Sequence, residues 1–269
     1  MPIDASAVIS PTSRVHPDAL IGPQTIIGEY CVIESDVVIG ARCRIEPYVY
    51  IKRWTRMGDD NQISAGSVLG TDPLDRNFTG ERSYLQIGSG NRIREHYTIS
   101  RGTQQESSTI VGDDNYIMTN GHIAHNSIIG NHTVIASCAL VAGHVLVEDR
   151  AFISGGVVIH QFSRIGSLAM IGGNVRVNRD LPPYFLYSEF DAQPRGLNLV
   201  GLTRAGFSSE HIASLKTAYR LLYSTGLRLE AALQRIAAEV PNDYTLHLVQ
   251  FIRDCKRGIA RPRSGKVRV

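Results

Sequence analysis

The chain has 269 residues, with 28 Lys and Arg against 25 Asp and Glu, which gives a net charge of +3. Hydrophobic residues make up 43% and charged residues 20%, a composition that excludes a disordered chain. Six basic residues and no acidic ones lie between Lys256 and the C-terminus, so residues 1–255 carry a net charge of −3. A basic tail on a mildly acidic body does not indicate a nucleic-acid-binding fold.

The chain shows no membrane or export signal. No apolar run reaches the ~18–20 residues that a membrane span needs, and the first residues do not form a charged and then apolar signal peptide. The four cysteines form no CxxC pair and are interpreted as small buried hydrophobic residues in a reducing compartment. We therefore expect a cytoplasmic protein with no membrane span and no nucleic-acid partner.

Aliphatic residues recur at every sixth position from Ile9 to Val177. They occupy 26 of these 29 positions, and the exceptions are Asp75, Glu81 and Gln105. A period of six is neither the 3.6 of a helix nor the 2 of an ordinary strand. A short strand and a turn make six residues, and three such units close a triangular coil. Glycine follows the inward residue ten times and is expected to permit unusual backbone angles. The period predicts a parallel β-helix.

Two interruptions keep the phase of the repeat. Ile87 follows Leu69 by three periods, so the segment around residues 72–86 is predicted to be an excursion loop. Residues 103–108 interrupt the repeat in the same way on a smaller scale. Loops that leave a rigid scaffold often carry function.

The repeat is predicted to end at the DLPPY sequence of residues 180–184, because two prolines cannot continue a hydrogen-bonded ladder. Helical patterns follow at about 208–226, 229–240 and 243–256. We therefore divide the chain into a β-helix of residues 1–190 and an α-helical C-terminal domain of residues 191–269 with a basic tail. The helical domain is expected to cap the coil, whose apolar faces favour a homo-oligomer.

Three histidines are predicted to lie on successive coils, offset by about one position. These are His125, His144 and His160, and two strand spacings would separate the first from the last by about 10 Å. A histidine can act as a base near neutral pH. Three candidate interpretations are an exposed polar stripe, a zinc site like that of the β-helical carbonic anhydrases, and an acyl-transfer site. In the last, the Gly143 N–H is a candidate donor to an oxyanion.

Several motifs resemble the UDP-N-acetylglucosamine acyltransferase family over nearly the whole chain. They are HIAHN at 122–126, AGH at 142–144, VIHQF at 158–162, DLPPY at 180–184 and GLNLVGL at 196–202, with partial matches NRIRE at 91–95 and SRGT at 100–103. The resemblance implies an all-β left-handed parallel β-helix, a homotrimer and active sites between subunits. It implies transfer of a 3-hydroxyacyl group from acyl carrier protein to the 3-position of UDP-N-acetylglucosamine, the first step of lipid A biosynthesis.

The resemblance also assigns residue roles. His125 matches the general base and Gly143 the oxyanion donor, while Gly173 matches a position that limits acyl length and, with no side chain, favours a longer acyl chain. Positions that match substrate contacts are Asp75, Asn77, Ser100, His122, His144, His160, Gln161, Asn198 and Arg204. No metal and no cofactor are implied beyond the phosphopantetheine arm of the carrier.

Some family positions differ here. Asn77 stands where Lys is usual, Ser100 where His is usual, and Asn126 where Asp is common; Val200 replaces a common Glu, and Ala205 replaces the second Arg of a pair. Asn126 can hydrogen-bond but supplies no negative charge. Retained acyl transfer with a different acceptor, such as a 3-amino UDP-sugar or another nucleotide sugar, is therefore the alternative, and a non-enzymatic trimeric scaffold is a further one.

Overall fold

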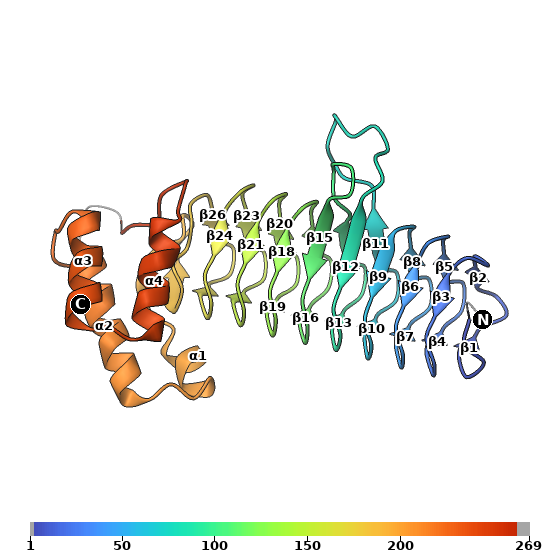
Figure 1. The fold of residues 1–269 in the computed structure, drawn as a ribbon, viewed down its shortest axis with the longest axis horizontal. Helices are drawn as coiled ribbons and strands as arrows, with labels where there is room; N and C mark the ends of the chain where they lie inside the picture. Colours follow the sequence, from blue (N-terminus) through green and yellow to red (C-terminus); the bar gives the residue numbers. More distant parts are fainter. Residues whose placement is uncertain (1–2, 263–269) are drawn as a thin grey trace.

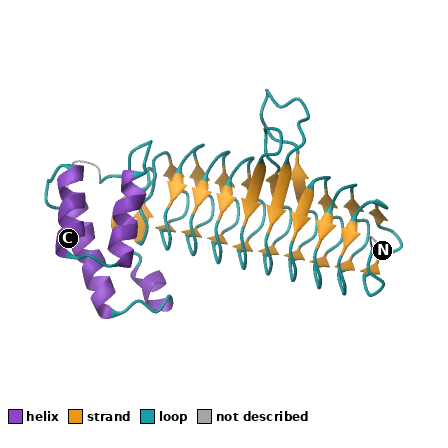
Figure 2. Ribbon diagram, viewed as in Figure 1, coloured by secondary structure: helices purple, strands orange, loops and turns teal. Residues whose placement is uncertain are grey.

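The computed structural model describes residues 3–262, which form a long coil of short strands ending in a helical domain (Figures 1 and 2). The strands of the described residues form three sheets of 11, 9 and 8 strands, and neighbours in each sheet are parallel apart from the last pair of the first sheet, β27 and β28.

The first sheet contains β1 (Val8–Ile9), β4 (Ile26–Ile27), β7 (Arg44–Ile45), β10 (Gln62–Ile63), β13 (Arg92–Ile93), β16 (Tyr116–Ile117), β19 (Val134–Ile135), β22 (Phe152–Ile153), β25 (Met170–Ile171), β27 (Phe185–Ser188) and β28 (Gln193–Leu197). The second contains β2 (Arg14–Val15), β5 (Val32–Ile33), β8 (Tyr50–Ile51), β11 (Val68–Thr71), β14 (Thr98–Ser100), β17 (His122–Ile123), β20 (Leu140–Val141), β23 (Val158–Ile159) and β26 (Arg176–Val177). The third contains β3 (Leu20–Ile21), β6 (Val38–Ile39), β9 (Thr55–Met57), β12 (Tyr84–Ile87), β15 (Ser108–Val111), β18 (Ile128–Ile129), β21 (Leu146–Val147) and β24 (Arg164–Ile165).

The six-residue period forms the core of the coil, as predicted. From Ile21 to Val177 every aliphatic residue at these positions is buried, while Ile9 and Val15 in the first coil are half-buried. Residues one coil apart pair in register, as Ile9 does with Ile27. The three exceptions to the period, at positions 75, 81 and 105, all lie in the two interrupting loops. The predicted parallel β-helix with a small α-helical C-terminal domain is confirmed.

The expected role of the glycines is wrong for most of them. Of the ten glycines that follow an inward residue, Gly70 alone has a positive φ, of 77°. The positive φ values lie instead at the turn positions, which non-glycine residues such as Asn126 and His144 occupy. At Gly22 a Cβ would lie 2.6 Å from the carbonyl carbon of Gly40 in the next coil. Most of these glycines therefore serve the close stacking of successive turns, and Gly172, where a Cβ would meet nothing closer than 3.4 Å, is the exception.

The larger interruption forms a loop over residues 72–83 between β11 and β12, and the smaller one a loop over 101–107 between β14 and β15. Figure 1 shows them rising together from the coil. Arg101 anchors the larger loop because its buried guanidinium pairs with Asp72 and lies 5.0 Å from the Trp54 ring centroid and 5.2 Å from that of Phe78.

The segment after the two prolines still forms strands. After the two prolines, β27 still pairs in parallel with β25, and β28 then turns back antiparallel to β27, so strand structure continues to Leu197. Four helices follow: α1 (Leu199–Arg204), α2 (Ser209–Tyr223), α3 (Leu229–Glu239) and α4 (Asp243–Arg253). The last three match the predicted helices, whereas α1 was not predicted. No helix of the described residues is long and apolar enough to cross a membrane.

A hydrogen-bonded cluster joins the helical domain to the coil. The Nε2 atom of His247 on α4 lies 3.1 Å from Oε2 of Glu148, and its Nδ1 lies 2.7 Å from the Tyr184 hydroxyl. The backbone N–H and hydroxyl of Ser167 also donate to Glu148, at 2.8 and 3.0 Å. Burial raises the pKa of Glu148, but these hydrogen bonds outweigh it and hold the pKa below its ordinary value near 4.5.

Replacing Glu148 by glutamine is expected to destabilise the protein by about 1–3 kcal/mol at neutral pH, because a charge-assisted hydrogen-bond acceptor is lost. A carboxylate with a lowered pKa contributes stability above its unfolded pKa, and this contribution is lost as the pH falls through the folded pKa. Thermal unfolding should therefore show a difference between the two proteins at pH 7 that shrinks below about pH 4.5. Glu189→Gln removes an exposed pair with Arg195 and is the matched control. A pH-independent difference would contradict the assignment.

Candidate functional site

The site lies at the corner of the coil where the second sheet ends and the two loops leave. His125 follows β17 and His144 follows β20 one coil later, and their ring centroids are 5.3 Å apart in an edge-to-face arrangement. The predicted proximity of these two histidines is confirmed. His160 directly follows β23 on the next coil.

Asn126 holds the His125 ring in place. Its Oδ1 atom lies 3.1 Å from Nδ1 of His125 and accepts from the backbone N–H and hydroxyl of Thr103, at 3.1 and 2.8 Å. The Thr103 N–H can only donate, so it assigns the amide oxygen to this position. A neutral His125 then carries its proton on Nδ1 and presents Nε2 as a lone pair. Only 4% of His125 is exposed. This is the tautomer that a general base requires.

Gly143 lies against the face of the His125 ring. A Cβ built on Gly143 would be 2.5 Å from Cε1 of His125 and 2.7 Å from Nε2, closer than real side chains approach. Among the described residues the Gly143 N–H donates no backbone hydrogen bond, although the neighbouring N–H of His144 donates to the His125 carbonyl at 3.0 Å. The His125 ring and a free backbone donor are therefore adjacent, an arrangement suited to proton transfer beside an oxyanion.

His122 presents a second imidazole on the outer face of β17. Its Nδ1 lies 2.8 Å from the Thr98 hydroxyl, and its buried Nε2 has no hydrogen-bond partner among the described residues. Burial is the main cause that lowers the pKa of His122, and the nearby His125 lowers it further. A neutral His122 with an unpartnered ring nitrogen is suited to hydrogen-bond a polar ligand.

His144 links the corner to the larger loop. Burial lowers the pKa of His144, as does His125, while the charge of Asp75 on the loop acts in the opposite direction. The ring of Phe162 stacks on His144 with centroids 4.7 Å apart and an interplanar angle of 15°. Phe162 was not predicted as a site residue, although it follows His144 by one coil of the repeat, and this spacing is the signal that would have identified it.

An apolar groove runs beside these residues along the outer face of the second sheet. Its volume is about 540 Å³, and its walls include Leu74 of the loop, His122, and the outward Leu140 and Val158. Leu74 is 81% exposed, which is unusual for a large apolar side chain. The apolar lining of the groove suits the acyl donor better than a sugar.

The other predicted residues are distributed around this corner and beyond it. Asp75 receives the Asn77 backbone N–H at 2.9 Å within the loop, and Asn77 is exposed. Ser100 is fully buried and its hydroxyl lies 2.9 Å from that of Thr71, so its side chain cannot reach the groove. His160 donates from Nδ1 to the Gln161 carbonyl at 3.0 Å. Gly173 is exposed, and a Cβ there would meet only the Gly155 carbonyl oxygen, at 3.4 Å.

Asn198 and Arg204 lie away from the histidines within one chain. Asn198 caps α1 by accepting the Gly201 N–H at 3.0 Å, and its amide donates to the Leu168 carbonyl at 2.9 Å. Arg204 is exposed at the last turn of α1. In Figure 1, α1 lies at the helical end of the molecule, far from the two loops.

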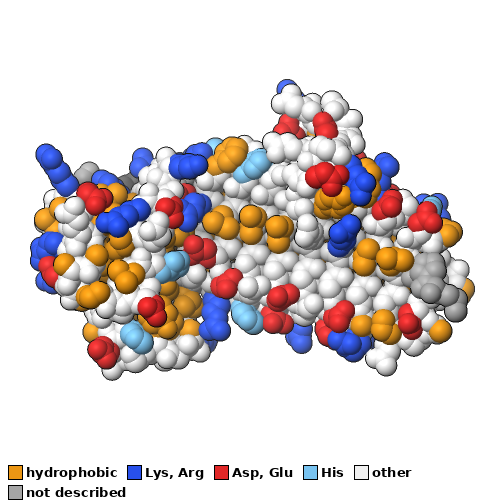
Figure 3. Space-filling view, in the orientation of Figure 1, with side chains coloured by type: hydrophobic (Ala, Val, Ile, Leu, Met, Phe, Trp, Pro, Cys, Tyr) orange, Lys and Arg blue, Asp and Glu red, His pale blue; other side chains and the backbone are white. Residues whose placement is uncertain are grey.

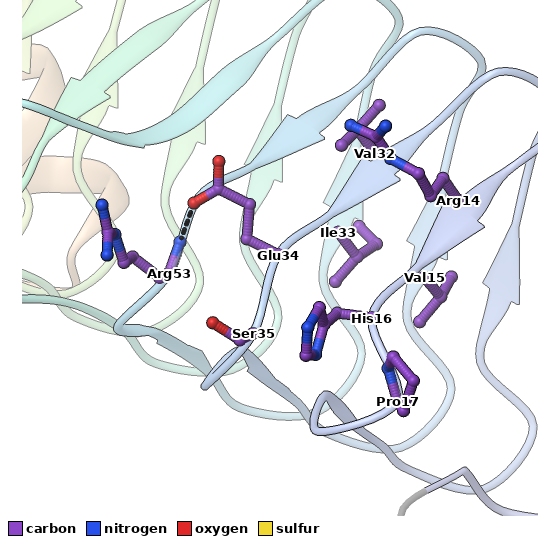
Figure 4. Close-up of a pocket in the computed structure, with 9 residues that line it drawn as sticks. All are labelled: Arg14, Val15, His16, Pro17, Val32, Ile33, Glu34, Ser35 and Arg53. Carbon is purple, nitrogen blue, oxygen red and sulfur yellow. Dashed lines mark hydrogen bonds between the residues drawn. The ribbon is translucent and has the colours of Figure 1, made fainter.

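Another cavity, of about 560 Å³, lies at the N-terminal end of the same face (Figure 4). Its walls include Arg14, His16, Glu34 and Arg53, and Glu34 accepts the Arg53 backbone N–H at 2.9 Å. None of the predicted site residues lines it, so its size alone does not make it the catalytic site.

The side chains of the described residues do not support the zinc interpretation. Within residues 3–262, no group of three His, Cys, Asp or Glu side chains is arranged to hold a metal ion. The edge-to-face contact of His125 and His144 also differs from two rings directing nitrogens at one ion.

Comparisons with known proteins agree on one family. A sequence profile described as UDP N-acetylglucosamine O-acyltransferase, domain 2, matches residues 180–260, and a bacterial transferase hexapeptide profile matches residues 36–71. An acyl-[acyl-carrier-protein]–UDP-N-acetylglucosamine O-acyltransferase from Verminephrobacter eiseniae is 42% identical over 262 residues, which cover 93% of this chain and 100% of the relative.

Solved structures give the same result. A UDP-N-acetylglucosamine acyltransferase from Bacteroides fragilis has a TM-score of 0.92 at 40% identity, covering 94% of this chain and 99% of that one. The enzyme from Arabidopsis has a TM-score of 0.80 at 33% identity, covering 96% and 99%.

Proposed function

The chain belongs to the UDP-N-acetylglucosamine O-acyltransferase family, and we propose that it transfers a 3-hydroxyacyl group from acyl carrier protein to the 3-hydroxyl of UDP-N-acetylglucosamine, the first step of lipid A biosynthesis. The observation that carries the proposal is the pairing of His125 with Gly143. The ring has its Nδ1 engaged by Asn126 and its face covered by a glycine with a free N–H.

The chemistry follows from that pairing. Nε2 of His125 takes the proton of the acceptor hydroxyl as the oxygen attacks the thioester carbonyl. The Gly143 N–H donates to the oxyanion that forms. The carbonyl then re-forms, the carbon–sulfur bond breaks, and the His125 proton passes to the departing thiolate, which leaves as the free thiol of the carrier arm. Asn126 keeps the ring oriented through both proton transfers but supplies no charge to stabilise the imidazolium.

The residues around the base provide contacts for the two substrates. The unpartnered Nε2 of His122 and the carboxylate of Asp75 are suited to the hydroxyls of a sugar, and the apolar groove is suited to the acyl donor. At Gly173 the surroundings leave room for a side chain, so its absence is consistent with a longer acyl chain.

We include a homotrimer in the proposal. Asn198 and Arg204 lie far from His125 in one chain, so another copy would have to bring them to the site. Outward hydrophobic residues such as Leu20, Ile128 and Phe152 are exposed on the faces of the single coil. Figure 3 shows such hydrophobic side chains gathered in patches along the coil. Burial of these patches would favour association.

One observation favours an acceptor other than UDP-N-acetylglucosamine. Ser100 is fully buried at a position where the resemblance leads us to expect His, so the imidazole expected there is absent. A 3-amino UDP-sugar or another nucleotide sugar is the acceptor that this difference allows.

A paired acceptor assay tests the proposal. Purified protein is supplied with 3-hydroxyacyl carrier proteins of increasing chain length, and with either UDP-N-acetylglucosamine or its 3-amino analogue. We expect O-acylated product, with kcat/KM for the hydroxyl acceptor at least about tenfold above that for the amine, since a site adapted to one acceptor rejects the other. The reverse preference would establish the alternative, and no thioester consumption with either acceptor would leave only the scaffold.

A further inference from the structure

The apolar groove continues into a basic cavity toward the helical end. This second cavity, of about 520 Å³, shares Val158 with the groove and is also lined by His160, Arg176, Arg179 and Arg257. Along the second sheet, the outward positions His122, Leu140, Val158 and Arg176 pair one after another. The two cavities therefore follow one line, which starts beside the base and ends among arginines.

The arginines come from two distant parts of the chain. Arg179 follows β26, while Arg257 follows α4, and a short parallel bridge between Asp180 and Ile259 brings the segments together. In this bridge the Asp180 N–H donates to the Gly258 carbonyl at 3.1 Å and the Ala260 N–H donates to the Asp180 carbonyl at 2.9 Å. A Cβ on Gly258 would lie 3.7 Å from Nη1 of Arg179, so this guanidinium extends over the segment that carries Arg257.

Two of the three guanidinium groups lack a counter-charge. Arg176 is neutralised by Asp191, with Nη2 to Oδ1 at 2.6 Å, and lies 5.1 Å from the Phe190 ring centroid. Within the described part of the chain, no carboxylate pairs with Arg179 or Arg257. Two neighbouring cations without partners create a positive potential that attracts an anion, and guanidinium groups match phosphate oxygens well.

We propose that Arg179 and Arg257 form a phosphate subsite for the phosphodiester of the acyl donor's pantetheine arm. This inference rests on the proposed function and names where the donor lies. His125 follows β17 and Arg179 follows β26, three strand spacings or about 14 Å apart along the coil. In the donor, two amide-linked units separate the thioester from the phosphate. In the acceptor, the diphosphate is attached to the same sugar ring that carries the reacting hydroxyl. A phosphate of the acceptor therefore lies too close to that hydroxyl to span the distance from His125 to Arg179.

Binding of small fragments tests the subsite without any turnover. We titrate 4′-phosphopantetheine and pantetheine, and in parallel UDP and uridine, into the full-length protein by calorimetry. The wild type is expected to bind phosphopantetheine at least about tenfold more tightly than pantetheine, the gain typical of a charge-assisted contact. The double variant Arg179→Gln, Arg257→Gln is expected to lose this preference and to retain the preference for UDP over uridine.

The control is Arg150→Gln, which removes an exposed arginine at a different corner of the coil and is expected to leave both preferences unchanged. Thermal melting checks that the double variant is folded; if it is not, the single variants are measured. An unchanged preference for phosphopantetheine, or loss of the UDP preference instead, would overturn the assignment. Because the measured quantity is binding, a failed acylation assay would refute the proposed function but would not change the measured preference for phosphopantetheine over pantetheine.

Discussion

Replacing His125 by alanine is expected to lower kcat by at least about 10²-fold, the contribution typical of a general base. The structure leaves no other imidazole in its position, since His144 presents an edge to it and His122 lies on the preceding strand. KM for the sugar acceptor is expected to change less than kcat, because proton transfer contributes in the transition state. Steady-state kinetics with acyl carrier protein and UDP-N-acetylglucosamine measures both.

Two further variants separate chemistry from folding. His125→Gln keeps most of the buried volume and is expected to lose activity to a similar extent while melting near the wild-type temperature. His132→Ala removes an exposed histidine at another corner of the coil and is expected to retain activity. Near-normal turnover by His125→Ala would remove His125 from the mechanism and would favour the scaffold alternative.

Replacing Gly143 by alanine is expected to reduce kcat by about 10²-fold, because displacement of a catalytic group by about an ångström has an effect of this size. The new Cβ would lie 2.5 Å from Cε1 of His125, so the ring or the coil backbone has to move. Either movement separates the base from the Gly143 N–H. The measurement is kcat together with the thermal melting temperature.

Gly172→Ala is the matched control for this variant. Gly172 directly precedes a turn on a later coil, and a Cβ there would be 3.4 Å from its nearest neighbour, an ordinary contact. We expect Gly172→Ala to keep kcat within about twofold of the wild type, as for a tolerated surface change. Full activity in Gly143→Ala would show that the close approach to His125 is not required.

The regular part of the fold could be predicted because its rule is local. In a coil of short strands, each residue stacks on the one a fixed distance along the chain, so Ile9 pairs with Ile27 and His125 lies beside Gly143. The three main helices followed from their own caps and apolar faces, as Ser208 and Gly226 illustrate for α2. The helix α1 escaped prediction because six residues leave too little pattern.

A basic tail such as that of residues 256–269 is suited to approach an acidic partner such as acyl carrier protein. Residues 263–269 of that tail lie outside the described residues. Its described part contributes Arg257 to the basic cavity that Arg179 also lines, and this cavity adds positive charge at the end of the apolar groove.

The amino-acid sequence by itself determined the coil, the order of its strands and the approach of His125 to Gly143, because in a repeat each residue stacks on the one a fixed number of positions along the chain. Only the tertiary structure decided that Ser100 is buried, that Thr103 orients Asn126, and that Arg257 returns to Arg179. These contacts join irregular loops and distant segments. Their geometry depends on the packing of many side chains together, and no local period encodes it.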